Sequence, residues 1–161
     1  MSSFMEKSVL VLGGSRGIGA AIVRRFVADG AKVSFTYSGS PDAARALASD
    51  TGSAAFQTDS SDRDAVIARV RDSGPLDVLV INAGIAIFGD ALDQDPDAID
   101  RLFRINVQSP YHASVEAARQ MPAGGTARRN PAGTSPGAWP GCRRSCLCPS
   151  RLARRWLSPV L

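Results

Sequence analysis

A glycine-rich turn between an apolar segment and a helix-forming segment constrains this chain more than any other feature. Residues 8–19 read Ser-Val-Leu-Val-Leu-Gly-Gly-Ser-Arg-Gly-Ile-Gly, and residues 20–26 continue as Ala-Ala-Ile-Val-Arg-Arg-Phe. We expect Gly13 to form a tight turn after a buried strand, Gly17 to let the backbone approach a pyrophosphate, and Gly19 to let helix and strand pack closely. The backbone N–H groups of the first helical turn would then attract an anion. The sequence therefore predicts a phosphate-binding loop.

Segments typical of strands and helices alternate over the first 121 residues. The segments that predict strands are residues 8–12, 32–37, 54–57 and 76–81. The helices that follow the glycine helix are expected to begin at Pro41, Arg63 and about Asp97, and the last of them to continue to Met121. Strands joined by helices require right-handed crossovers. The expected fold class is therefore α/β, the N-terminal half of a doubly wound parallel sheet with about four strands.

The composition of the chain changes abruptly after residue 121. Residues 1–121 hold all 15 acidic residues against 2 Lys and 10 Arg, whereas residues 122–161 hold seven Arg and no acidic residue. Six prolines and five glycines in the second segment disfavour a central strand or a long helix there. We therefore expect a domain over residues 1–121, with its fourth strand at the edge of the sheet, and an irregular tail over residues 122–161. The composition of this tail is typical of a GC-rich gene read out of frame, from about Gly125 onward.

The tail does not predict a site of its own. Its cysteines are spaced as Cys142-x-x-x-Cys146-x-Cys148 with no fourth ligand nearby, so no metal site is expected. Its arginines lack regularly interleaved aromatic residues, so nucleic-acid binding is not expected. The N-terminus lacks the pattern of a signal peptide, and no apolar stretch is long enough to cross a membrane. A cytoplasmic protein is the expectation, which the lack of cysteine in residues 1–121 also favours.

Three further markers accompany the glycine turn in a fixed order. Asp59 follows the third expected strand, Asn82-Ala83-Gly84 follows the fourth, and Asn106 stands within Arg-Ile-Asn-Val. Together with the glycine turn, these markers resemble the short-chain dehydrogenase/reductase family over residues 6–121. The resemblance implies a dinucleotide-binding fold of the Rossmann type and an oxidoreductase that acts on a carbonyl/alcohol pair.

The resemblance also implies which residues would hold the cofactor. Those expected at the pyrophosphate and the adenosine ribose are Gly13, Ser15, Arg16, Gly17, Ile18 and Gly19. Asp59 and Ser60 would lie at the adenine. Asn82, Ala83 and Gly84 would lie on the side of the nicotinamide ribose. Asn106 would support the catalytic proton relay.

The end of the second expected strand bears on the choice of cofactor. A carboxylate there would accept hydrogen bonds from both ribose hydroxyls and would repel a 2′-phosphate. This chain has Tyr37, Ser38 and Gly39 instead, with no carboxylate until Asp42. Arg16 can reach the same position and pair with a phosphate. We therefore predict NADP(H) rather than NAD(H).

The catalytic pair of the family is not found in this sequence. In the family, a Tyr transfers the proton and a Lys four residues later lowers its pKa, but this chain has no tyrosine after Tyr111 and no lysine after Lys32. Asn106 would be a remnant of the relay, so the chain is expected to be an inactive version truncated before the Tyr-x-x-x-Lys. An ordered oligomer is expected for the intact parent but not for this chain.

A second function remains open at this point. The segments at residues 12–19 and 111–121 are similar to a subgroup of the family that binds cyclic-di-GMP and mediates biofilm dispersal. A regulator of this kind needs no catalytic tyrosine, and its ligand's phosphates could use the same helix N-terminus. The alternative is therefore a non-catalytic cyclic-di-GMP-binding protein.

Overall fold

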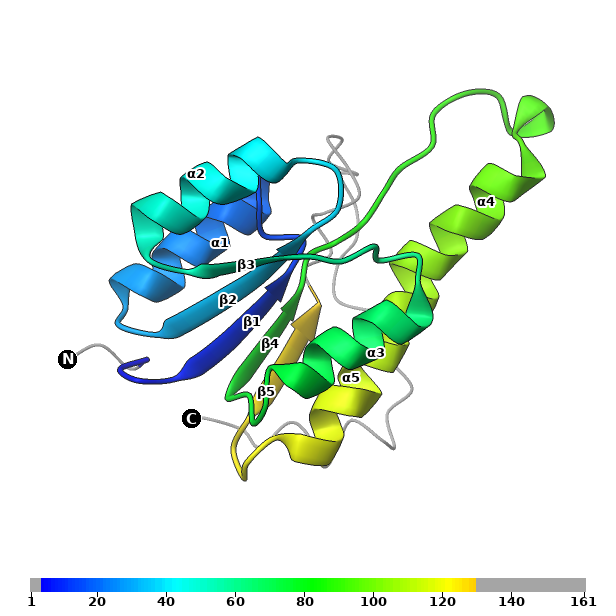
Figure 1. Ribbon diagram of the computed structural model, residues 1–161. Helices are drawn as coiled ribbons and strands as arrows, with labels where there is room; N and C mark the ends of the chain where they lie inside the picture. Colours follow the sequence, from blue (N-terminus) through cyan, green and yellow to red (C-terminus); the bar gives the residue numbers. More distant parts are fainter. Residues whose placement is uncertain (1–3, 130–161) are drawn as a thin grey trace, which may run out of the picture.

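A single parallel sheet with helices on both faces makes up the computed structural model, which describes residues 4–129 (Figure 1). The strands are β1 (Ser8–Leu12), β2 (Lys32–Tyr37), β3 (Ala54–Gln57), β4 (Val78–Ile81) and β5 (Thr126–Arg129). The helices are α1 (Gly17–Ala28), α2 (Pro41–Thr51), α3 (Arg63–Asp72), α4 (Pro96–Phe103) and α5 (Ser109–Gln120). The strand order is β3-β2-β1-β4-β5. The first three strands follow one another toward one edge of the sheet, and β4 and β5 are added on the other side of β1, so the strand order reverses between β1 and β4. The predicted α/β class with a doubly wound parallel sheet is confirmed.

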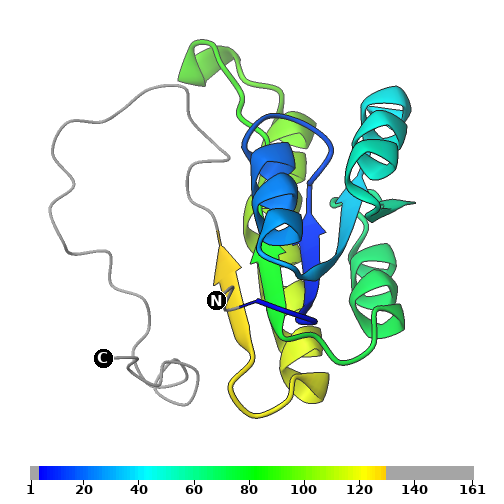
Figure 2. The same cartoon turned by 90° about the vertical axis from the view of Figure 1, so that its left-hand side faces the viewer.

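The two faces of the sheet form separate apolar cores, because alternate residues of β1 point to opposite sides. Val9 and Val11 pack with α1 and α2, whereas Leu10 and Leu12 pack with α3 and α5. Figure 2, turned by 90° from Figure 1, shows helices on either side of the strands. All four of these β1 side chains are buried, which explains why the strand reads as a continuous apolar run.

The fifth strand corrects the sequence prediction. β5 pairs in parallel with β4, from Val78 opposite Thr126 to Ile81 opposite Arg129, and the Thr126 N–H donates to the Asp77 carbonyl at 2.8 Å. The expectation that β4 forms the edge of the sheet and that the sheet ends before residue 122 was therefore wrong. No proline lies between Pro122 and Pro131, and β5 is held by backbone hydrogen bonds without an apolar pattern of its own. The part of the tail beyond residue 129 lies outside the described residues.

The single helix expected from about Asp97 to Met121 is instead two α-helices, α4 and α5, separated by a short segment of another type. Between α4 and α5 the chain forms a π-helical segment, η2 (Arg104–Gln108). Pro110 accounts for part of this change, because it has no N–H to donate to the carbonyl of Asn106, four residues earlier. The π-turn leaves Ile105 and Asn106 buried. Within residues 4–129, no helix is long and apolar enough to span a bilayer.

Candidate functional site

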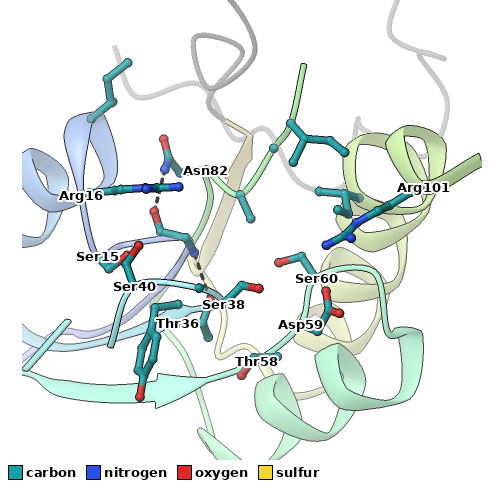
Figure 3. A pocket seen from close by; sticks show the side chains of 18 residues that line it. Ser15, Arg16, Thr36, Ser38, Ser40, Thr58, Asp59, Ser60, Asn82 and Arg101 are labelled. Carbon is teal, nitrogen blue, oxygen red and sulfur yellow. Dashed lines mark hydrogen bonds between the residues drawn. The ribbon is translucent and has the colours of Figure 1, made fainter. Parts of the chain in front are cut away.

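A pocket of about 470 Å³ lies where the segments that follow β1, β2, β3 and β4 meet (Figure 3). In open α/β sheets, ligands bind outside the carboxyl ends of the strands, at the point where the strand order reverses. The pocket occupies this position. The predicted site residues that line it are Gly13, Ser15, Arg16, Ile18, Tyr37, Ser38, Asp59, Ser60, Asn82, Ala83 and Gly84. Gly17, Gly19 and Asn106 do not line it.

The turn after β1 is fixed by contacts of its backbone. Gly13 has φ +77°, its N–H donates to the Thr36 hydroxyl at 3.0 Å, and its carbonyl accepts from the Asn82 side-chain amide at 2.7 Å. A Cβ on Gly13 would lie 2.7 Å from the Ala83 Cα, and one on Gly19 would lie 2.1 Å from the Gly13 oxygen. Both positions therefore require glycine, and Gly19 lets α1 pack closely against the turn after β1.

The N-terminus of α1 is left open toward an anion. Arg16 occupies the N-cap position but makes no side-chain capping hydrogen bond, and the first turn of α1 holds no acidic residue. By contrast, Asp62 caps α3 and Asp95 caps α4 with their carboxylates. A Cβ added to Gly17 would meet no heavy atom within 4 Å, so the space beside this backbone is open to a ligand. A pyrophosphate fits this arrangement, because the N–H groups of a first helical turn need an acceptor.

Two guanidinium groups and one carboxylate belong to the pocket. Arg16 enters it from the α1 side and Arg101 from α4, and Asp59 lies in the turn after β3 (Figure 3). Tyr37, Ser38 and Gly39, which follow one another at the end of β2, bring no acidic group into the pocket. The described part of the pocket is therefore suited to a ligand with several negative charges.

Asp59 is held as an anion by its own turn. The Ser61 N–H donates to Asp59 Oδ1 at 2.9 Å. This backbone hydrogen bond holds the pKa of the Asp59 carboxyl below its ordinary value, and the Arg101 charge lowers it further. The carboxylate is therefore ionised at neutral pH and can accept a hydrogen bond from a ligand.

Asn106 acts on the pocket through the loop after β4. Its side-chain amide donates to the Ile85 carbonyl at 2.7 Å, and its side-chain oxygen accepts from the Ile85 N–H at 3.0 Å. Asn106 is only 8% exposed, so this pair of hydrogen bonds is shielded from water. Asn106 therefore positions the loop, while Ile85 and Ile105 line the pocket.

Several pocket residues were missed by the sequence analysis. They are Thr36, Gly39, Ser40, Thr58, Ile85, Arg101 and Ile105. Thr36 carried a usable signal, since it is a buried hydroxyl at the end of a strand and must find a partner. Arg101 carried none, because an arginine on an exposed helix normally lies in solvent. Gly14 was also missed: a Cβ there would lie 2.5 Å from the Phe35 Cβ.

No group of three His, Cys, Asp or Glu side chains suited to a metal ion occurs within residues 4–129. Cys142, Cys146 and Cys148 lie outside the described residues.

Comparisons with known proteins extend the resemblance seen in the sequence. The cyclic-di-GMP-binding biofilm dispersal mediator protein of Escherichia coli is 69% identical over 125 residues, which are 78% of this chain and 53% of that protein. The crystal structure of BdcA in complex with NADPH has a TM-score of 0.78 and 67% identity, over 78% of this chain and 52% of that one. A short-chain dehydrogenase from Burkholderia cenocepacia in complex with NADP has a TM-score of 0.74 and 41% identity, over 78% of this chain and 55% of that one.

The chain spans about half the length of each of these relatives. Its residues 7–128 match the sequence model described as short chain dehydrogenase. That match ends within β5, so it includes most of the strand that the sequence analysis did not expect. On the shared sequence, fold and pocket position, the chain belongs to the short-chain dehydrogenase family.

Proposed function

We propose that this protein binds NADP(H) in the pocket at the carboxyl ends of β1 to β4. The observation that carries the proposal is the uncapped N-terminus of α1, which opens beside a pocket that contains two arginines. The pyrophosphate would accept hydrogen bonds from the backbone N–H groups of the first turn of α1, the helix that follows the glycine loop at Gly13. Asp59 and Ser60 would lie at the adenine, and Asn82, Ala83 and Gly84 on the side of the nicotinamide ribose.

The preference for a 2′-phosphate rests on the end of β2 and on Arg16. Tyr37 and Ser38 bring no carboxylate that would repel the phosphate, and the Arg16 guanidinium can form paired hydrogen bonds with it. The prediction of NADP(H) agrees with the NADPH or NADP complexes of three similar proteins: BdcA, a blue fluorescent protein from a metagenomic library and the Burkholderia cenocepacia dehydrogenase.

The chemistry that a bound nicotinamide supplies is the transfer of a hydride to or from a carbonyl/alcohol pair. This chain would bind and orient the cofactor, and Asn106 would hold the loop beside it through Ile85. It has no tyrosine after Tyr111 and no lysine after Lys32 to move the accompanying proton. We infer that this chain binds the cofactor without reducing a carbonyl substrate.

Replacement of Arg16 tests the cofactor assignment. Arg16→Ala should weaken NADPH binding about tenfold and leave NADH binding nearly unchanged, because only NADPH carries the phosphate that Arg16 would contact. Arg24→Ala is the matched control, since Arg24 lies on α1, the helix that follows Arg16, but outside the pocket. Titration of intrinsic and nicotinamide fluorescence measures both affinities. An equal loss of affinity for the two cofactors, or no loss of affinity for NADPH, would show that Arg16 does not contact the 2′-phosphate.

A second candidate function is the binding of cyclic-di-GMP by a non-catalytic regulator of biofilm dispersal. It is favoured by 69% identity to a protein named for that ligand and that role. Cyclic-di-GMP has two phosphates, which the α1 N-terminus and the pocket arginines could accept. If both ligands use one pocket, then cyclic-di-GMP displaces NADPH competitively in an equilibrium titration. Saturable binding of both ligands without competition would place them in different sites.

A cytoplasmic location remains a proposal for this protein. The lack of cysteine in residues 1–121 supports it, since this part needs no oxidising compartment. Cell fractionation with an antibody against the chain tests it, and recovery in the membrane or extracellular fraction would contradict it.

A further inference from the structure

Arg101 is a pocket residue whose guanidinium group forms no hydrogen bond or ion pair with a carboxylate of the described residues, although its charge lowers the pKa of the Asp59 carboxyl. Several other arginines on the helices do form such an ion pair: Arg25 pairs with Asp29 at 2.9 Å, and Arg71 with Glu116 at 2.9 Å. Within residues 4–129, Arg101 has no hydrogen bond or ion pair through its guanidinium group. The group is therefore available to a ligand, and its position in the pocket decides which part of the ligand it can meet.

The Arg101 side chain extends from α4 toward the turn that contains Asp59 and Ser60 (Figure 3). Arg16 enters from the α1 side, where the phosphate-binding turn lies. The two cations thus belong to different ends of the pocket. Arg101 is accordingly not placed to share the pyrophosphate with α1.

The surroundings of Arg101 suit a flat, partly apolar group. Ile105, four residues later and on the same side of the helical segment, also lines the pocket, and Thr58 lies at the base of the facing turn. A guanidinium group is planar and weakly hydrated, and it stacks readily on the faces of rings and nucleobases. The ionised Asp59 carboxylate accepts hydrogen bonds, which the exocyclic amine at the edge of a purine base can donate.

We propose that Arg101 is a specificity-determining residue that stacks its guanidinium plane on the purine base of the bound nucleotide while the Asp59–Ser60 turn meets the edge of the base. This inference rests on the proposed function, because it assumes that the base lies at Asp59 and Ser60. It goes beyond that function by assigning a base-contacting role to a residue of α4. A purine dinucleotide would then be bound at both ends, by Arg16 at the phosphates and by Arg101 at the base.

The test separates the base from the phosphates by using fragments of the cofactor. Binding of NADPH, of adenosine 2′,5′-bisphosphate and of reduced nicotinamide mononucleotide is measured by calorimetry with the whole chain. Arg101→Leu should weaken NADPH and the adenosine bisphosphate about tenfold, equal to about 1.4 kcal/mol. It should leave the mononucleotide, which has no adenine, unchanged. A purely structural effect would weaken all three ligands together.

Arg101→Lys distinguishes stacking from charge, because lysine keeps the charge but has no planar group. We expect this variant to lose most of the same affinity for the two adenine-containing ligands. Affinities equal to those of the unchanged chain would assign the effect to charge and overturn the stacking role. The matched control is Arg104→Leu: Arg104 is exposed in the adjoining π-helical segment and does not line the pocket.

The possible failures of the two proposals can be told apart. If the unchanged chain binds NADPH and Arg101→Leu binds it equally well, then the inference about Arg101 is wrong and the proposed function stands. If the unchanged chain binds none of the three ligands, then both are wrong. Thermal unfolding of each variant shows whether it is folded. Should Arg101→Leu fail to fold, the result with Arg101→Lys decides.

Discussion

At the scale of single residues, the wall of the pocket after β1 depends on the close approach of the Gly13 and Gly19 backbones. Gly19 brings α1 against the carbonyl of Gly13, and Asn82 holds that same carbonyl. The sequence predicted the roles of Gly13 and Gly19 because the spacing of glycines reflects steric limits that act locally. It could not predict that Gly14 faces Phe35, because that contact joins the turn after β1 to the neighbouring strand β2.

Gly19→Ala should destabilise the protein by about 1–3 kcal/mol, since the new Cβ would overlap the Gly13 oxygen and disturb the Asn82 hydrogen bond. Urea denaturation measures the change in the free energy of unfolding. Gly39→Ala is the matched control, because a Cβ at Gly39 meets no heavy atom within 4 Å. Equal stability of the two variants would contradict the packing role of Gly19.

Asn106→Ala should release the loop after β4 by leaving the Ile85 N–H and carbonyl without their partner. The expected cost is about 1–3 kcal/mol in the free energy of unfolding. Hydrogen exchange of the Ile85 amide should also become faster, which chemical denaturation alone would not reveal. The control is Gln108→Ala, at an exposed position of the same π-helical segment. Unchanged exchange at Ile85 would show that the loop is held by other contacts.

At the scale of elements, α3 and α5 are joined by a buried carboxylate. Glu116 of α5 accepts from Arg71 of α3 at 2.9 Å and from Arg119 at 3.0 Å, while its side chain is only 7% exposed. The hydrogen bond from Arg71 is the largest cause that holds the pKa of Glu116 below its ordinary value, and Arg119 adds to it. A lowered pKa in the folded state means that the native protein binds this proton less readily than the unfolded chain does.

The stabilisation by Glu116 should therefore be complete above its ordinary pKa of 4.5 and should disappear as the pH falls through the lowered pKa of the folded state. Glu116→Gln should lower the Tm at neutral pH and make the loss of stability in acid less steep. Thermal unfolding between neutral pH and about pH 3 measures both effects. Asp42→Asn on the exposed face of α2 serves as the control. Parallel pH profiles for Glu116→Gln and the unchanged chain would contradict this account.

β5 shows what the sequence could and could not reveal about elements. β1, β2 and β3 were predicted with their observed bounds because their residues are apolar or alternate regularly. Thr126-Ala-Arg-Arg has no such pattern, since it is held by its backbone beside β4. The π-turn within the last helix was missed for a related reason: it depends on Pro110 and on the partner that Asn106 finds at Ile85.

Thr126→Pro should destabilise the sheet by at least about 1 kcal/mol, because proline cannot donate the hydrogen bond to the Asp77 carbonyl. Thr126→Ala keeps the backbone N–H and is the matched control. Denaturation together with light scattering measures stability and aggregation, since the loss of β5 would expose the edge of β4. Equal behaviour of the two variants would mean that β5 adds nothing to the sheet.

At the scale of the whole molecule, the composition from residue 122 onward bears on the origin of this sequence. We propose a change of reading frame near the codon of Gly125, motivated by seven arginines and no acidic residue in residues 122–161. Sequencing the coding DNA over codons 115–161 and translating all frames tests this proposal. A frame that encodes a serine and Tyr-x-x-x-Lys would support it. No such frame would mean that residues 122–161 are the genuine continuation.

We propose that this protein binds NADP(H), and calorimetric titration of the 161-residue chain with NADPH and with NADH tests this proposal most directly. We expect saturable binding of one NADPH per chain, about tenfold or more tighter than NADH, and no oxidation of NADPH above a boiled control with a panel of ketones. No saturable binding of either cofactor, or equal affinity for both, would contradict the account of the site. Oxidation of NADPH dependent on a ketone would contradict the account of its chemistry.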